Sequence, residues 1–397
     1  MPAKVAKSIY VVFFLAAILV IRNPSGGNRE NASVLNSISG RLAQSDVQAE
    51  ESGLERFTEK KVDQVPSGLS YGYYGNTCPN AEIIVRNTMR EILNEHKDTT
   101  AALLRLLFHD CFIEGCDASV MLDDSNGNSN KSIERQAIPN KTLKGFDKID
   151  RIKDELERAC PGVVSCADIL VLATMNSIHM AGGPFYPVFT GRLDSTRSYF
   201  DTAMAEIPKP DDNITQTLHL FSLRGFDSRE TVSLLGAHNI GKIGCDFIQT
   251  RLNNFHGTGG PDPSLTPNFL DELRRTCQDN NSSDNAESPT PPNSRKLVES
   301  PTKLGMTYYQ GLSIEVPSGS TFDTHYYRSL VNNRGLLFAD QQLMADGATR
   351  NQVRDYASDD GSAFRRDFAR VMFKMSNLNV LTGQNGVVRL NCSMPVD

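Results

Sequence analysis

The sequence from Ala101 to Ser119, AALLRLLFHDCFIEGCDAS, most constrains how this chain can fold. Its first part is rich in apolar residues and has no glycine or proline before Gly115, which predicts a helix that ends in a tight loop. Arg105 and His109 are four residues apart, so one helical face presents both. A neutral imidazole accepts a proton while a guanidinium stabilises developing negative charge, which favours acid-base chemistry. The alternative is a buried helix whose Arg and His are simply hydrogen-bonded.

The loop after this helix is rich in the oxygen donors that calcium prefers. Side-chain oxygens are available from Asp110, Asp117 and Ser119, and backbone carbonyls from Ile113 and Gly115. A disulfide between Cys111 and Cys116 would close the loop. Zinc bound by His109 and these two cysteines is the metal alternative, which the even cysteine count disfavours.

Composition and charge exclude several classes of protein. The chain has 397 residues, of which 39% are hydrophobic and 22% charged, so it can bury a sizeable core. The net charge of -6 and the lack of a basic block argue against nucleic acid as a partner. Eight cysteines would pair in an exported protein, and the alternative is eight reduced thiols in a cytosolic one.

The N-terminus favours export. Lys4 and Lys7 precede an apolar run from Ile9 to Ile21, which has the length of a signal-peptide core. Because no small-residue cleavage site follows, residues 1–22 are predicted to be a signal peptide or an uncleaved signal anchor. Residues 23–66 are polar and serine-rich, and we expect an N-terminal extension without a core of its own.

Helical patterns dominate the rest of the chain. Apolar residues recur at helical spacing in residues 85–93, 149–156, 167–180, 228–235 and 364–375, whereas strand patterns are scarce. Residues 278–314 are rich in Asn, Ser, Pro and charge, which predicts a disordered surface insertion. The fold class is therefore predicted to be mainly α.

Several motifs resemble the secreted plant haem peroxidases (class III, the horseradish peroxidase family). They are RLLFHDCFIEGCDASVML, PGVVSCADIL, LLGAHNIGKIGC and VVRLNC, and the similarity runs from about Leu69 to Cys392. The resemblance implies a haem peroxidase domain at 67–397, whose helices form two halves around haem b. It also implies the disulfides Cys78–Cys160, Cys111–Cys116, Cys166–Cys392 and Cys245–Cys277.

The resemblance also implies a reaction, in which hydrogen peroxide is reduced to water through a ferryl intermediate and small phenolic donors are oxidised by single electrons. His238 would bind the haem iron, with Asp340 accepting its other ring N–H; a helix N-cap is the alternative role for Asp340. On the opposite side the implied residues are Arg105, His109, Asn140, Glu134 and Phe108. Asn140 would accept the His109 ring N–H and Glu134 would continue the hydrogen-bond chain, although Asn140 also begins a glycosylation triplet. Phe108 would admit only small peroxides, and Pro208 would line the exposed haem edge.

Two calcium sites are implied, and the second departs from the family pattern. The first uses the loop oxygens named above, and the second would use Asn239, Glu315, Ser318, Thr321 and Asp323. Asn239 stands where the family has Thr, and Glu315 is longer than the usual Asp. The chain has no tryptophan, and Tyr186 replaces the one that the family usually carries.

We therefore expect a secreted monomer of the extracellular space or cell wall, with tethering to the membrane as the alternative. Several Asn-x-Ser/Thr triplets, for example at Asn31, Asn213 and Asn281, agree with the secretory route. A functional alternative is a peroxidase-fold protein that binds haem or cell-wall material with little turnover. The two differ in whether peroxide and a phenol are turned over.

Overall fold

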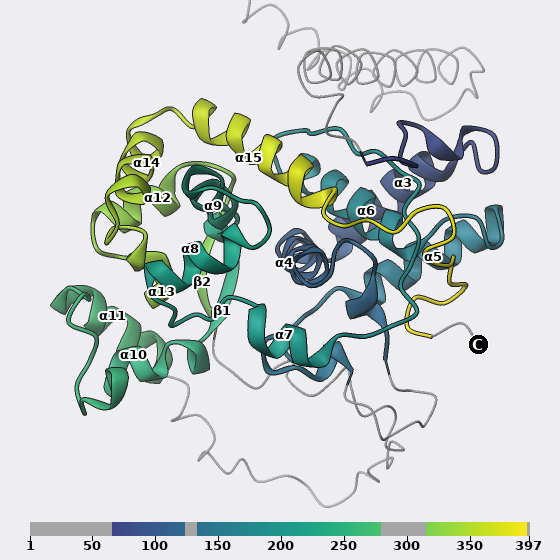
Figure 1. Ribbon diagram of the computed structural model, residues 1–397. Helices are drawn as coiled ribbons and strands as arrows, with labels where there is room; N and C mark the ends of the chain where they lie inside the picture. Colours follow the sequence, from purple (N-terminus) through teal and green to yellow (C-terminus); the bar gives the residue numbers. More distant parts are fainter. Residues whose placement is uncertain (1–65, 124–132, 279–314, 395–397) are drawn as a thin grey trace, which may run out of the picture. The chain divides into compact units, whose positions relative to one another are not determined.

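Helices make up most of the computed structural model of the chain, which confirms the mainly α prediction (Figure 1). The structure describes residues 66–123, 133–278 and 315–394. The signal segment, the extension up to residue 65 and residues 279–314 of the predicted insertion lie outside the described residues, so these domain boundaries stay predictions. Within the described ranges, no helix is long and apolar enough to cross a membrane.

The helices are α3 (Ala81–Glu95), α4 (Thr99–Phe112), α5 (Phe146–Ala159), α6 (Cys166–Met180), α7 (Phe200–Glu206), α8 (Ile214–Ser222), α9 (Ser228–Leu235), α10 (Gln249–Asn253), α11 (Pro267–Gln278), α12 (His325–Val331), α13 (Phe338–Gln342), α14 (Gly347–Ser358) and α15 (Ser362–Ser376). The predicted helical stretches correspond to α3, α4, α5, α6, α9 and α15, and the structure adds further helices that the sequence analysis did not predict. Short 3-10 turns connect several of them, including η5 (Ile138–Asn140) and η6 (Gly236–Asn239).

Helices α3 to α6 form one half of the fold, on the right of Figure 1. Helix α6 is buried on nearly every side, which is why its sequence is almost uniformly apolar. Its first turn is fixed by Ser165, whose hydroxyl accepts a hydrogen bond from the Asp168 N–H at 3.2 Å. Helix α4 packs against α6 and lies near the centre of the molecule.

Helices α9, α12, α14 and α15 form the other half. The start of α9 is set by a capping box, in which the Asp227 carboxylate accepts the Glu230 N–H at 2.8 Å and Glu230 returns a bond to the Asp227 N–H. Helix α15 contacts both α9 and α4, so it joins the two halves. The apolar stripe of Phe364, Phe368 and Met372 on α15 is fully buried.

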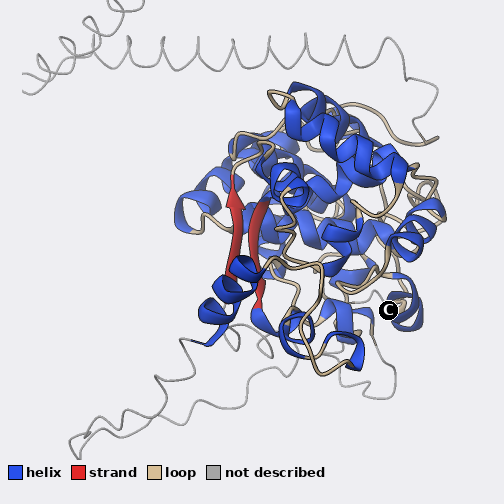
Figure 2. Cartoon of the chain, turned by 90° about the vertical axis from the view of Figure 1, so that its left-hand side faces the viewer, coloured by secondary structure: helices blue, strands red, loops and turns tan. Residues whose placement is uncertain are grey.

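One small sheet lies beside the helices. Strand β1 (Ile240–Gly244) begins directly after η6 and pairs in antiparallel fashion with β2 (Glu315–Ser320), and the two strands run side by side in Figure 2. Ile240 is opposite Ser320, and Gly244 is opposite Glu315. The sheet therefore fixes the end of η6 beside the segment that leads into α12.

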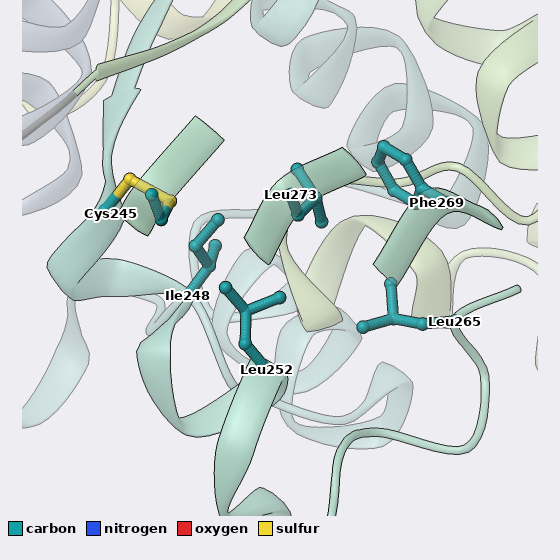
Figure 3. Close-up of a cluster of buried hydrophobic side chains, with 7 residues drawn as sticks. Cys245, Ile248, Leu252, Leu265, Phe269 and Leu273 are labelled. Carbon is teal, nitrogen blue, oxygen red and sulfur yellow. A yellow bond between two sulfur atoms is a disulfide. The ribbon is translucent and has the colours of Figure 1, made fainter. Parts of the chain in front are cut away.

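A separate apolar cluster stabilises the segment that contains α10 and α11. Its buried side chains surround the Cys245–Cys277 disulfide and are Ile248, Leu252, Leu265, Phe269 and Leu273 (Figure 3). The other three disulfides join Cys78 to Cys160, Cys111 to Cys116 and Cys166 to Cys392, so all four pairs are those that the resemblance implies. No cysteine of the chain is left free.

Candidate functional site

Helix α4 is mostly buried, and three of its partly exposed residues lie along one stripe. Ala101, Arg105 and Phe108, at positions i, i+4 and i+7, keep partial exposure, while the next residue, His109, is 5% exposed. Both predicted distal groups, the guanidinium and the imidazole, lie on or beside this stripe.

His109 is held in one orientation by Asn140. The His109 Nδ1 and Asn140 Oδ1 atoms are 2.6 Å apart, and Asn140 Nδ2 donates to the backbone carbonyl of Glu134 at 2.9 Å. Because Nδ2 is the donor to Glu134, Oδ1 must accept from His109, which places the ring proton on Nδ1 and leaves Nε2 as an acceptor. Asn140 is 1% exposed and uses both ends of its amide, which disfavours a glycan at this position.

Burial and a neighbouring charge keep His109 neutral. Loss of solvation and then the positive charge of Arg105 lower the pKa of His109 to about 3, although the bond to Asn140 opposes this. Burial also lowers the pKa of Arg105 to about 10, so the guanidinium stays charged at neutral pH. Arg105 is positioned by its Nη1 bonds to the Thr142 carbonyl and hydroxyl, at 3.1 and 3.0 Å, and by an Nη2 bond to the Pro139 carbonyl at 2.9 Å.

His238, in η6, makes the matching contact on the other half of the fold. Its Nδ1 is 2.7 Å from Asp340 Oδ1, and the same oxygen accepts the Tyr326 hydroxyl at 2.9 Å. Asp340 Oδ2 accepts the Leu337 N–H at 3.2 Å. Leu337 is the N-cap of α13 and Asp340 is the third residue of the helix, so the carboxylate stabilises the first turn from within it and the alternative N-cap role is wrong. Burial lowers the pKa of His238, but the Asp340 charge and hydrogen bond outweigh it and raise the pKa overall.

The two imidazole segments are close in the fold. Gly241 of β1 lies against Ala101 of α4, where an added Cβ would be 2.9 Å from the alanine methyl. The charge of Arg105 also acts on His238 and contributes to lowering its pKa. The structure therefore brings together the segments that carry His109 and His238, which are far apart in the sequence.

The residues present fit a haem group. With Nδ1 of His238 committed to Asp340, Nε2 is the nitrogen available to iron, and the side chain is 43% exposed although its partner Asp340 is buried. An imidazole with a carboxylate on its far nitrogen is a usual iron ligand. The open stripe of α4 supplies the facing surface.

Phe108 and Pro208 flank this region. Phe108 stacks on Phe112, with ring centroids 4.6 Å apart, and is 5.8 Å from the His109 ring. Pro208 is partly buried just after α7, the helix that packs against η5 with Asn140. These positions agree with the roles expected of both residues, which stay predictions.

The predicted distal calcium loop contains buried oxygens without partners. Asp110 Oδ1, the Ser119 hydroxyl and both Glu134 carboxylate oxygens are buried and accept no hydrogen bond of normal length. Burial and then the charge of Asp117 raise the pKa of Asp110, and burial and then the charge of Asp110 raise that of Glu134. A cation would relieve both effects. The described residues contain no group of three His, Cys, Asp or Glu arranged for a metal, so hydroxyl and carbonyl oxygens would have to complete the site, as is common for calcium.

Glu134 thus differs from the expectation for it. Asn140 bonds to its main-chain carbonyl, whereas its carboxylate is directed toward Asp110 and Ser119. Ile113 and Gly115 are buried in the same loop. The φ of Gly115 is 137°, and a Cβ added at this residue would be 2.5 Å from the carbonyl oxygen of Asn379, so only glycine fits there.

The predicted proximal calcium set is only partly described. Asn239 is buried, Asp323 is mostly exposed, and the side chains of Glu315 and Ser318 lie outside the described residues. The Asn239 amide oxygen accepts the Tyr326 N–H at 3.2 Å, and Asp323 Oδ2 accepts the Thr321 hydroxyl at 2.8 Å. These oxygens already have partners. In the distal loop Asp110 Oδ2 and Asp117 Oδ1 also accept N–H groups, but Asp110 Oδ1 and the Ser119 hydroxyl have no partner.

Sequence reasoning missed Tyr326 and the carbonyls that position Arg105. A tyrosine in FDTHYYRSL carries no signal that it will reach Asp340, because the contact depends on how α12 meets α13. The Pro139 and Thr142 carbonyls adjoin Asn140, but carbonyl acceptors are present in every residue and cannot be singled out.

A mainly helical fold with an aspartate-bound imidazole in one half and an arginine-histidine-asparagine group in the other defines a haem enzyme of the peroxidase type. A sequence model described as Peroxidase matches residues 85–359. Putative Peroxidase 48 from Arabidopsis thaliana is 48% identical over 337 residues, which is 82% of each chain. Peroxidase 57 from Arabidopsis thaliana and Peroxidase N1 from Nicotiana tabacum are each 38% identical, over 82% of this chain and 91% and 90% of their own. The chain belongs to the peroxidase family.

Proposed function

We propose that this protein is a haem peroxidase that reduces hydrogen peroxide to water and oxidises small phenolic donors by single electrons. The observation that carries the proposal is the neutral, oriented His109 beside a charged Arg105, in a fold that also presents an aspartate-bound His238. Bound haem b would supply the redox-active iron for both half-reactions, and His238 Nε2 would hold it.

His109 would move the proton that the reaction requires. Its Nδ1 proton is committed to Asn140, so Nε2 is the atom that accepts a proton from one peroxide oxygen. The same Nε2 can return the proton to the other oxygen, which then leaves as water rather than hydroxide. The low pKa of His109 favours this role, because the ring stays neutral over the whole physiological range.

Arg105 would stabilise the negative charge that develops as the oxygen–oxygen bond breaks. Its anchoring to the Thr142 and Pro139 carbonyls keeps the guanidinium in place before peroxide arrives, so little reorganisation is needed. Phe108, beside His109, would limit access to small peroxides. Phenolic donors would approach the haem edge near Pro208.

Calcium at the distal loop would link structure to this chemistry. Asp110 directly follows His109, so a cation bound by Asp110, Asp117 and Ser119 would fix the end of α4. The four disulfides support an oxidising compartment, and we propose secretion to the extracellular space or cell wall as a monomer. Tethering through residues 1–22 is the alternative that N-terminal sequencing of the mature protein distinguishes.

The proposal is tested by the absorption spectrum and the turnover of the purified protein. We expect a Soret band of histidine-bound ferric haem, and a His238→Ala change should abolish or grossly alter it. His109→Ala should retain haem but slow the reaction with peroxide by about 10²–10⁴, the usual contribution of acid-base catalysis. His219→Ala, an exposed histidine on α8, is the matched control and should change neither property.

Two results would contradict the proposal. A haem-loaded wild-type protein that fails to turn over peroxide and a phenol would favour the alternative of a haem-binding protein without catalysis. An unchanged Soret band in His238→Ala would remove His238 as the iron ligand.

A further inference from the structure

The two predicted calcium sites differ in whether the oxygens that the structure describes are already used. In the distal loop, Asp110 Oδ1 and the Ser119 hydroxyl are buried without partners, and both carboxylates of the set, Asp110 and Asp117, are at most 2% exposed. Such atoms carry an uncompensated desolvation cost unless a cation binds them. This set needs a metal.

In the proximal set, both oxygens of Asp323 accept hydrogen bonds from the chain itself. Oδ1 accepts the His325 N–H at 2.8 Å and also contacts His325 Nδ1, and Oδ2 accepts the Thr321 hydroxyl at 2.8 Å. The Asp323 side chain is 57% exposed, so water also solvates it. Unlike Asp110, Asp323 has no oxygen that lacks a hydrogen-bond partner.

Asn239 offers no free amide oxygen either. Its Oδ1 accepts the backbone N–H of Tyr326 at 3.2 Å, which fixes the orientation of the amide. The atom of this side chain that has no partner is Nδ2, and an N–H donor cannot ligate a cation. Buried beside the site, it would repel one.

The ring of His325 lies within this set. A Cβ added to Gly319 of β2 would collide with both the His325 ring, at Nε2 and Cε1, and the backbone carbonyl of Asn239. The imidazole therefore extends from Asp323 toward the Asn239 carbonyl, the two ends of the predicted ligand set. It occupies space that an ion between these groups would require.

From these contacts we infer that the protein binds one calcium ion rather than two, at the distal loop, and that the His325 side chain replaces the metal in the proximal segment. A ring N–H donated to Asp323 organises the turn before α12, as a cation would otherwise do. The inference rests on the distal calcium site of the proposed function, but not on catalysis.

The test is the calcium content of the haem-loaded full-length protein after dialysis against calcium-free buffer, measured by plasma mass spectrometry. One calcium per chain is expected, and two would overturn the inference. Asp323→Asn should still contain one calcium, whereas Asp117→Asn should contain none. The reverse pattern would also overturn it, because the occupied site would then be the proximal one.

A titration covers the case in which Asp117→Asn does not fold. Wild-type protein treated with a chelator and titrated with calcium chloride in a calorimeter should bind one equivalent, and binding of a second would refute the inference. Absence of any calcium would overturn it too, since the distal loop would then be empty. The Soret band and the phenol turnover of the same sample are measured separately. They show whether the peroxidase activity is present even when the calcium content contradicts the inference.

Discussion

Replacing Tyr326 with phenylalanine should lower the reduction potential of the bound haem. Asp340 Oδ1 is shared by His238 Nδ1, at 2.7 Å, and the Tyr326 hydroxyl, at 2.9 Å. Removing the hydroxyl concentrates the carboxylate charge on the bond to His238, which makes the imidazole a stronger donor to iron and stabilises the ferric state.

The size of the shift follows from the hydrogen bond that is lost. A bond to a charged acceptor contributes roughly 1.5–3 kcal/mol. We take the lower energy, about 1.5 kcal/mol. If about half of it stabilises ferric iron relative to ferrous iron, the midpoint potential falls by about 30 mV, because about 1.4 kcal/mol corresponds to 59 mV for one electron. If all of it does, the fall is about 60 mV.

Spectroelectrochemistry of the ferric/ferrous couple measures this shift, and Tyr327→Phe is the matched control. Tyr327 is the next residue of α12, is equally buried, and donates to the Val232 carbonyl at 3.1 Å instead of to Asp340. The Tyr327→Phe variant should lose a buried tyrosine hydrogen bond, as Tyr326→Phe does, but its reduction potential should be unchanged. Equal potentials in the two variants, or a rise in Tyr326→Phe, would refute the reasoning.

Three further outcomes follow from the same contacts. The rate constant for reaction with peroxide, measured by stopped flow, should stay level as pH falls and drop only near pH 3. The reason is that His109 must be neutral to accept a proton, and its pKa is lowered to about 3. A drop near the ordinary histidine pKa of about 6.5 would contradict this. Tyr186→Phe should raise the free energy of unfolding by about 1 kcal/mol in denaturant titrations, because the buried Tyr186 hydroxyl has no hydrogen-bond partner. A lower free energy of unfolding would show that the hydroxyl does make a hydrogen bond. Chelation of calcium should lower the thermal unfolding midpoint, since Asp110 and Glu134 would lose their counter-charge; a midpoint independent of calcium would argue against the distal site.

Glu134 connects two parts of the site that the sequence treats separately. Its backbone carbonyl orients Asn140 and through it His109, while its carboxylate adds to the unsatisfied oxygens of the calcium loop. Loss of the cation would therefore disturb the distal acid-base group as well as the stability of the fold.

The sequence by itself determined the helices and the identity of the principal groups. Apolar periodicity predicted α3, α5, α9 and α15, because it depends on neighbours within a few residues. Arg105 and His109 were found from their spacing on one helix. His238, Asp340 and the three disulfide pairs other than Cys111–Cys116 were found only through the resemblance.

Only the tertiary structure decided which donors and acceptors meet. That Glu134 serves Asn140 through its carbonyl, and that Tyr326 shares the oxygen of Asp340 that His238 uses, both depend on contacts between separate elements. Hydrogen bonds require positions within a few tenths of an ångström. Sequence patterns fix the face of a helix but not the distance between two of them.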